Sequence, residues 1–356
     1  MKETIRFERH IQKASFHNPM HGMSLDTQEI EIRRDPLSGQ QSVLNPALEG
    51  KAAVVYGPRD TALIERLAEE SRSRCILCGN AWETLTPKYP DEVVPGGRIR
   101  VGECVLFPNL FPVAQVHAVI RVGSRHFRSL REFDPATIAE ALQCAFALTE
   151  RVYRSAREVR FFAVAANYLG PAGASMVHPH FQVVGGDLPF SYQETVGLLS
   201  RRYFEAHGSC YWIDLLEAEK ACGERYIGRT GSVDWIAAYA PQGTNEVVGI
   251  LPERRSFAEV DQQDVSGIAR GLSSVLKGYD ELGMSTFNFA LYSGPLGLED
   301  DSVRCWLRAI TRQNVYENYR TDDYFMQKLL RNEVVLVRPE MVASTMRKVF
   351  SEDRAK

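Results

Sequence analysis

The sequence from Asn167 to Gln182 reads Asn-Tyr-Leu-Gly-Pro-Ala-Gly-Ala-Ser-Met-Val-His-Pro-His-Phe-Gln. Its first part is rich in glycine and other small residues. Gly170 and Gly173 let backbone amides approach a phosphate closely, and the side chains of Asn167 and Ser175 add neutral hydrogen-bond donors. This part of the segment therefore predicts a loop that binds an anion.

The second part of the segment places two histidines around a proline. Pro179 restricts His178 to an extended backbone, and we expect the imidazoles of His178 and His180 to point to opposite sides, one toward a metal and one toward substrate. Gln182 follows on the side of His180, where its amide can hydrogen-bond a phosphate oxygen or the leaving oxygen. A neutral imidazole that attacks phosphorus divides one displacement into two steps. Two histidines buried in an ordinary strand are the alternative, but they explain neither the glycines nor the glutamine.

Two closely spaced cysteines indicate a metal site. Cys75 and Cys78 form a CxxC motif whose thiolates can bind one tetrahedral ion. A closed structural site needs four ligands, and His126 and His178 are the best placed of the remaining candidates. We therefore expect a Cys2His2 zinc site, with His117 as the rival of His126. A buried pair of thiols or a redox pair is the alternative interpretation of the cysteines.

The chain contains two segments that follow the same plan. In each segment an apolar strand is followed by a polar turn, an amphipathic helix and a second buried strand. A shift of about 130 residues places Ile138 on Ile268 and Leu142 on Leu272, which indicates an internal duplication. Each unit would pair antiparallel strands with a covering helix, so the predicted fold class is α+β. We expect an N-terminal half with the zinc site and the nucleophile, a connection, and a degenerate C-terminal half, over residues 1–190, 191–235 and 236–356.

Composition restricts the function further. The 356-residue chain has a formal net charge of -3 and 24% charged residues, so it has no basic field for nucleic acid or an anionic membrane. Charged residues near the N-terminus stand where a signal peptide is apolar, and no stretch is apolar enough to span a bilayer. The seven cysteines argue for reduced thiols. We expect a cytoplasmic protein that acts on small molecules.

Together, the CxxC motif, His126 and the Asn167–Gln182 segment resemble the histidine-triad superfamily, specifically its galactose-1-phosphate uridylyltransferase branch. The segment Arg33-Arg34-Asp-Pro-Leu-Ser-Gly is similar to that branch's Arg-Arg-x-Asn-Pro-Leu-Thr-Gly segment, which contributes to nucleotide and phosphate binding. The segment Val-Leu-Phe-Pro-Asn109-Leu-Phe is similar to its base- and ribose-contacting strand. The resemblance covers most of residues 30–350.

The resemblance implies a site and a reaction. It implies duplicated histidine-triad-like units, a nucleotide sugar as one substrate, a sugar phosphate or phosphate as the other, and a homodimer. His180 would carry a nucleotidyl group during the reaction. Zinc would be bound by Cys75, Cys78, His126 and His178, and the transferred phosphate would be surrounded by Gln182, Asn167 and Ser175.

The C-terminal half departs from the family at the catalytic positions. The 130-residue shift places Arg308 against His178 and Ile310 against His180, so we expect no nucleophile in this half. Its role would be structural and in substrate recognition.

A second metal site, which the family often has, is expected to be absent. Arg255 stands where the family commonly has histidine, and Glu194, a weak candidate ligand, is better interpreted as a solvated helix residue. The stretch Leu330–Glu340 lacks the Glu-Thr-Gln-Arg pattern through which the galactose enzyme holds its hexose. It is more similar to the plant ADP-glucose phosphorylases.

Three functions remain in competition. The preferred one is a UDP-hexose:hexose-1-phosphate uridylyltransferase, in which a sugar phosphate accepts the nucleotide. An NDP-sugar phosphorylase, for example for ADP-glucose, or a dinucleoside polyphosphate phosphorylase would use inorganic phosphate instead. A catalytically silent zinc- or nucleotide-binding protein is the third, and it has no need of His180 as a nucleophile.

Overall fold

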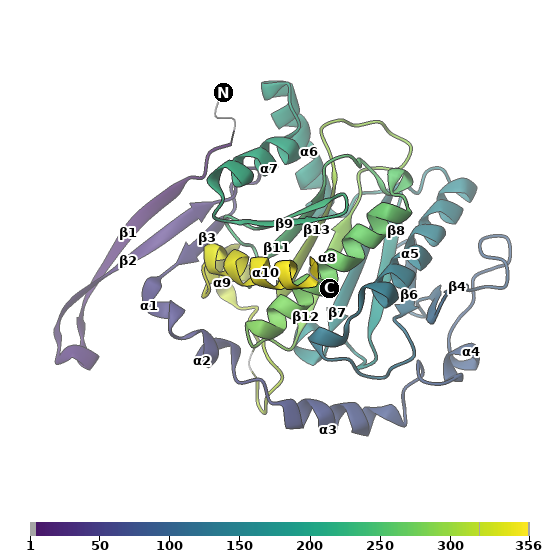
Figure 1. Ribbon diagram of the computed structural model, residues 1–356, viewed down its shortest axis with the longest axis horizontal. Coiled ribbons are helices and arrows are strands. Elements are labelled where there is room, and N and C mark those ends of the chain that lie inside the picture. The colour runs from purple at the N-terminus through teal and green to yellow at the C-terminus, as the bar shows by residue number, and fades with distance from the viewer. Residues whose placement is uncertain (1–4, 320, 355–356) are drawn as a thin grey trace.

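Ten antiparallel strands form one sheet through the centre of the structure (Figure 1). The computed structural model describes residues 5–319 and 321–354. Across the sheet, the strands follow the order β4 (Ile99–Val101), β5 (Cys104–Pro108), β6 (Val116–Arg121), β8 (His180–Gly186), β7 (Phe161–Tyr168), β12 (Phe287–Tyr292), β13 (Cys305–Thr311), β11 (Val247–Leu251), β10 (Val233–Ala237) and β9 (Tyr226–Thr230).

The order of the strands repeats about the centre of the sheet. The series β4, β5, β6, β8, β7 corresponds to β9, β10, β11, β13, β12, and the two halves meet where β7 pairs with β12. In each half one long helix precedes the central strand, α5 (Pro135–Ser155) before β7 and α8 (Gln262–Glu281) before β12. This is the predicted α+β architecture of two antiparallel units, each with a covering helix.

The two long helices begin at residues that can cap them. Asp134 accepts a hydrogen bond from the backbone N–H of Thr137, and Pro135 occupies the first turn of α5. Asp261 and Asp264 form a reciprocal capping box at the start of α8. The apolar faces of both helices pack on the sheet in one continuous core, which joins the two halves.

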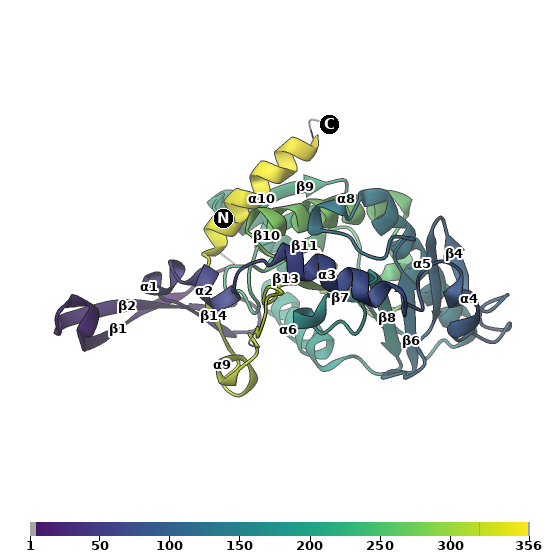
Figure 2. The ribbon, with the colours of Figure 1, turned by 90° about the horizontal axis from the view of Figure 1, so that it is seen from below.

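The opposite face of the sheet is covered differently in the two halves (Figure 2). In the second half, α6 (Ser191–His207) and α7 (Tyr211–Cys222) cover it, and Trp212 packs against Trp306 of β13. In the first half, Leu77 and Trp82 pack on Phe107 and Val119. Residues 191–235, expected to be a connection, thus hold two helices and β9, so the second half of the sheet begins before residue 236.

The remaining strands form a small second sheet. A long hairpin of β1 (Arg9–Asn18) and β2 (Ser24–Arg34) projects from the body (Figure 1), and β2 pairs with β3 (Gln41–Leu44), which pairs in parallel with β14 (Asn332–Val335). Among the described residues, none of the helices combines the length and apolar character that a bilayer crossing requires. The other helices are η1 (Pro19–His21), α1 (Pro46–Glu49), α2 (Ala52–Tyr56), α3 (Thr61–Arg72), α4 (Ala81–Leu85), η2 (Leu130–Glu132), η3 (Gly170–Ala172), η4 (Phe257–Glu259), α9 (Phe325–Lys328) and α10 (Pro339–Arg354).

Candidate active site and metal centre

The four predicted metal ligands meet beside the start of β8. Cys75 and Cys78 lie in the turns between α3 and α4, His126 follows β6, and His178 precedes β8. Their ligand atoms all lie within 4.8 Å of one another. Cys78 Sγ is 3.5 Å from His178 Nδ1 and 3.2 Å from His126 Nδ1, and Cys75 Sγ is 3.7 Å from His178 Nδ1. Because a tetrahedral zinc ion spaces such ligands roughly 3.4–3.8 Å apart, the four residues fit zinc.

Hydrogen bonds on the far side of each imidazole orient the rings. His178 Nε2 lies 3.2 Å from the carbonyl oxygen of Gly123, and His126 Nε2 lies 3.0 Å from Ser71 Oγ. A carbonyl oxygen only accepts, so the neutral ring of His178 carries its proton on Nε2 and turns the lone pair of Nδ1 toward the sulfurs. Histidines that bind metals are commonly oriented in this way.

The two kinds of ligand have opposite protonation preferences in the absence of a cation. Burial lowers the pKa of His178 to about 4, which keeps the ring neutral and able to coordinate. Burial, followed by the neighbouring Cys75 thiol, raises the pKa of Cys78 to about 11. A coordinated cation reverses the preference of Cys78 for the protonated thiol, because a thiol that binds a metal is deprotonated. His117, the rival ligand, is not part of the cluster.

His180 is the first residue of β8, and it is buried. Its Nδ1 lies 2.9 Å from the carbonyl oxygen of His178, so Nδ1–H donates this bond and Nε2 keeps its lone pair. Burial lowers the pKa of His180, which favours the neutral ring. Within the described residues no hydrogen bond to Nε2 is present. The ring therefore offers an uncommitted nitrogen nucleophile.

The two histidines take different directions for a reason other than the expected one. Residues two apart on a strand share a face, so an extended backbone cannot turn His178 and His180 to opposite sides. The expectation is wrong on this point. His178 lies in a bend outside the strand, where it reaches the cysteines, whereas His180 belongs to β8 and shares the face of Gln182.

The glycine-rich loop follows the end of β7. Gly173 has a left-handed backbone, with φ of +86°, and a Cβ at this position would lie 4.0 Å from Asn167 Nδ2. Leu169 also has positive φ, at 64°. Gly173 and Ser175 are exposed, and Asn167 is half-buried. The loop thus places an amide group and exposed backbone at the end of β7, next to the strand that begins with His180.

Two residues of the second half support this loop, and sequence reasoning missed both. Asn288 on β12 donates through Nδ2 to Asn167 Oδ1 at 2.7 Å and to the Ala172 carbonyl oxygen at 2.9 Å. Arg312 donates to Asn288 Oδ1 at 3.1 Å and pairs with Asp322. Because the oxygen of Asn167 is occupied, its NH2 group remains available to the loop. A polar residue, Asn288, within an apolar strand was visible in the sequence as a signal. The sequence did not show that Asn167 is its partner.

Gln182 contacts His117, which in turn contacts Asn109. Gln182 Oε1 lies 2.7 Å from His117 Nε2, and Asn109 Nδ2 lies 3.1 Å from that ring nitrogen. Asn109, predicted to bind substrate, and Gln182, predicted to be catalytic, are therefore brought together through His117, which lies on β6 beside β8. The sequence suggested His117 as a rival metal ligand or as a residue at the edge of a strand, and it did not connect His117 with Gln182.

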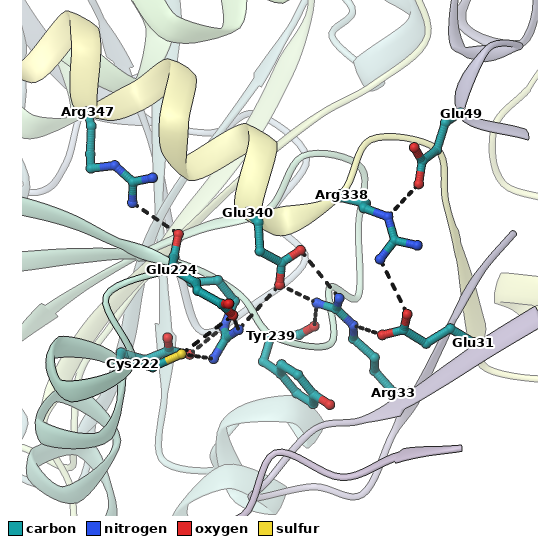
Figure 3. Close-up of polar contacts among 11 residues, drawn as sticks. Glu31, Arg33, Glu49, Cys222, Glu224, Tyr239, Arg338, Glu340 and Arg347 are labelled. Carbon is teal, nitrogen blue, oxygen red and sulfur yellow. Dashed lines mark hydrogen bonds and ion pairs between the residues drawn. The ribbon is translucent and has the colours of Figure 1, made fainter. Parts of the chain in front are cut away.

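Of the two arginines predicted to bind nucleotide, Arg33 lies among charged residues of β2 and α10 (Figure 3). Arg33 is 5% exposed, and its guanidinium donates to Glu31 at 2.7 Å and to Glu340 at 2.8 Å while it stacks on Tyr239. These partners commit Arg33 to joining β2 to α10. Arg34 is exposed on the same strand. Among the residues that the structure describes, no contact joins Arg33 or Arg34 to His180.

The face of the second half that matches the catalytic face carries no histidine. Cys305, Leu307 and Ala309 of β13 belong to the core beneath α8, so Trp306, Arg308 and Ile310 lie on the opposite face. Arg308 pairs with the buried Glu246 at 2.5 Å. None of Trp306, Arg308 and Ile310 is a histidine, so this face of β13 has no histidine nucleophile, whatever the exact shift between the repeats.

Two positions were considered for a second metal, and the first of them, Arg255, lies in ion pairs. Arg255 pairs with Glu259 at 2.8 Å and with Asp301 at 3.2 Å. Glu194 is exposed on α6. Among the described residues, the cluster at Cys75 is the group of histidines, cysteines and carboxylates with the geometry of a metal site.

The duplicated sheet and its covering helices form the same fold as the solved structures of an ADP-glucose phosphorylase and a uridylyltransferase. An ADP-glucose phosphorylase from Arabidopsis thaliana with bound ADP-glucose matches with a TM-score of 0.68 and 17% identity, over 90% of this chain and 98% of that chain. A uridylyltransferase matches with a TM-score of 0.65 and 15% identity, over 90% and 98% of the two chains. The resemblance inferred from the sequence is confirmed for the fold.

Comparison of sequences adds one relative. An uncharacterized protein of Archaeoglobus fulgidus is 29% identical over 352 residues, which are 98% of this chain and 100% of that protein. No model of a protein family matches the chain.

Proposed function

We propose that this protein is a nucleotidyltransferase that acts on nucleoside diphosphate sugars through a nucleotidyl group on His180. The observation that carries the proposal is the state of the His180 ring, in which Nδ1 is committed to the His178 carbonyl oxygen and Nε2 is not bonded. A silent binding protein has no need of such a nitrogen beside Gln182 and a glycine-rich loop.

The reaction proceeds in two displacements. In the first, His180 Nε2 attacks the α-phosphorus of the nucleotide sugar, an N–P bond forms, and the P–O bond to the departing sugar 1-phosphate breaks. In the second, an oxygen of the acceptor phosphate attacks the same phosphorus, the N–P bond breaks, and the neutral imidazole is restored. The Nδ1–H bond to His178 supports the positive charge that the ring takes on between the two steps.

Charge on the transferred phosphate is stabilised by neutral donors. The amides of Gln182 and Asn167 and the loop at Gly173 and Ser175 supply these donors. They are placed before the reaction begins, so little reorganisation is needed when charge develops. Asn109 would contact the nucleoside.

Zinc is proposed to act in structure and not in chemistry. Cys75, Cys78, His126 and His178 would fill all four positions of the ion, which leaves no open position for water or substrate. By fixing His178, the site also fixes the carbonyl oxygen that orients His180.

The preferred substrates are a UDP-hexose and a hexose 1-phosphate. A phosphorylase that uses inorganic phosphate is the second candidate, because the ADP-glucose phosphorylase has the same fold and the C-terminal stretch lacks the hexose-holding pattern. Both candidates share the first displacement and differ only in the acceptor.

The test separates donor from acceptor. The purified protein is mixed with UDP-glucose, ADP-glucose or a dinucleoside tetraphosphate, and the first product is measured without an acceptor. We expect one of the donors to release its leaving group in an amount close to that of the protein, which is glucose 1-phosphate from a nucleotide sugar or a nucleoside triphosphate from the dinucleoside tetraphosphate. Turnover should follow only after galactose 1-phosphate or inorganic phosphate is added. Absence of release with all three donors from zinc-replete, folded protein would refute the proposal.

A further inference from the structure

The structure assigns a positioning role to His117: we propose that this histidine sets the orientation of the Gln182 amide, so that the NH2 group of Gln182 faces the phosphate bound at His180. The inference deepens the proposed function and rests on it for its kinetic consequence. Its structural part, the orientation of one amide, can be tested separately.

The protonation pattern of the His117 ring follows from its contact with the backbone. Nδ1 of His117 lies 3.2 Å from the backbone N–H of Val113, which is always a donor. Nδ1 must therefore accept, and the proton of the neutral ring sits on Nε2. Nε2–H then donates to the oxygen 2.7 Å away, which is Oε1 of Gln182.

This donation determines which end of the Gln182 side chain reaches the site. The oxygen and nitrogen of a glutamine amide are close in shape, so an unrestrained side chain can present either. With Oε1 held by His117, the NH2 group must occupy the other position. A glutamine turned the other way would present an oxygen to an anionic phosphate and repel it.

Strand geometry aims this NH2 group at the reaction. Gln182 and His180 are two residues apart on β8, so their side chains share one face. The Cα partner of Gln182 on β6 is Val119, and His117 is the next residue on that face of β6. Neighbouring strands bring diagonal side chains of this kind into contact. The donor of His117 therefore approaches Gln182 from the side away from His180.

His117 also anchors the loop that contains Asn109. The backbone N–H of Asn109 donates to the His117 carbonyl oxygen at 2.8 Å, and Asn109 Oδ1 accepts from the backbone N–H of Phe111 at 2.9 Å. Asn109 Nδ2 lies 3.1 Å from His117 Nε2 and cannot donate to a nitrogen that already carries a proton. Its amide protons stay available for substrate. One imidazole thus joins the candidate nucleoside loop to the candidate phosphate donor.

The kinetic test is a double-mutant cycle on the first displacement. The rate of nucleotide transfer to the protein is measured in single turnover with UDP-glucose or ADP-glucose for wild type, His117→Leu, Gln182→Ala and the double variant. We expect His117→Leu to lose roughly tenfold to a hundredfold in rate at saturating donor, because a misplaced donor stabilises the transition state less. In the Gln182→Ala background the same change should cost less than twofold.

Two further variants separate positioning from general damage. His117→Gln keeps an N–H that can reach Gln182 Oε1 and should recover most of the rate. Gln115→Ala is the matched control, because Gln115 directly precedes β6 and its side chain accepts from the backbone N–H of Asp187 and does not contact Gln182. It should leave the rate unchanged. Equal losses from His117→Leu with and without Gln182 would overturn the proposal.

A second measurement does not need catalysis. The side-chain amide of Gln182 is followed by NMR in protein labelled with ¹⁵N-glutamine, and its signal is assigned by its loss in Gln182→Ala. We expect one sharp pair of amide signals in wild type and in His117→Gln, and a shifted or exchange-broadened pair in His117→Leu. An unchanged pair in His117→Leu would refute the positioning role even if no donor reacts with the protein.

Discussion

The side-chain amide of Asn288 donates to the side-chain oxygen of Asn167 across 2.7 Å, at the point where the two halves of the sheet meet. The two residues are directly opposite each other on β12 and β7. The C-terminal half thereby holds a loop of the N-terminal half, which contains the proposed nucleophile His180. This gives the degenerate repeat a role that needs no chemistry of its own.

Replacement of Asn288 tests this role. Asn288→Ala removes the donor to Asn167 and Ala172 and the acceptor of Arg312. We expect the rate of nucleotide transfer to His180 to fall about tenfold, with an unfolding free energy lower by about 1–3 kcal/mol, as is usual for lost buried hydrogen bonds. Zinc content should not change. A rate within twofold of wild type, in folded protein, would show that the loop does not depend on Asn288.

If the cluster at Cys75 binds zinc, the protein should contain one zinc ion per chain and should lose it when a ligand is replaced. Elemental analysis should find one zinc ion per chain in wild type. Cys78→Ser should lose the metal and unfold at lower temperature, because the binding energy of a structural ion is coupled to folding. Cys222→Ser is the matched control, since Cys222 is an exposed cysteine outside the cluster. If Cys78→Ser binds zinc as firmly as Cys222→Ser does, the ligand set is wrong.

We expect the stability of the protein to depend on pH because of one buried carboxyl group, that of Glu333 on β14. Burial raises the pKa of Glu333 on β14 to about 7, above its ordinary value of 4.5. The folded state therefore holds the proton more tightly than the unfolded state, and stability is lost as pH rises from about 5 to about 8. Glu333→Gln cannot ionise and should gain about 2 kcal/mol relative to wild type over this range. Denaturant unfolding of both proteins at pH 5 and pH 8 measures the difference, and an equal gap at the two pH values would contradict it.

The candidate metal ligands and the proposed nucleophile could be named from the sequence because they lie in short local patterns. The CxxC motif is short, and the spacing of His178, His180 and Gln182 is maintained wherever the strand lies. The duplication was also visible, since Ile138 and Ile268 lie at matching positions of α5 and α8. These features require no knowledge of how distant strands pair.

Residues that act through a neighbouring strand were not predictable in the same way. The contact of His117 with Gln182 depends on the register of β6 against β8, and that of Asn288 with Asn167 depends on the pairing of the two halves. One sequence contains no information on such registers beyond its apolar pattern. For Arg33 the local motif was visible but the surroundings were not. The motif predicted a residue of the nucleotide site, whereas the partners of Arg33 in this chain are Glu31 and Glu340.

The proposed function assigns nucleotide transfer to His180 and metal binding to His178. Wild type, His180→Gly and His178→Gly are each mixed with UDP-glucose or ADP-glucose, and intact mass and zinc content are measured on the same samples. We predict an acid-labile nucleotide adduct in wild type, none in His180→Gly with zinc and fold retained, and loss of both zinc and stability in His178→Gly. An adduct in His180→Gly, or an adduct of wild type that maps to residues 236–356, would contradict the account.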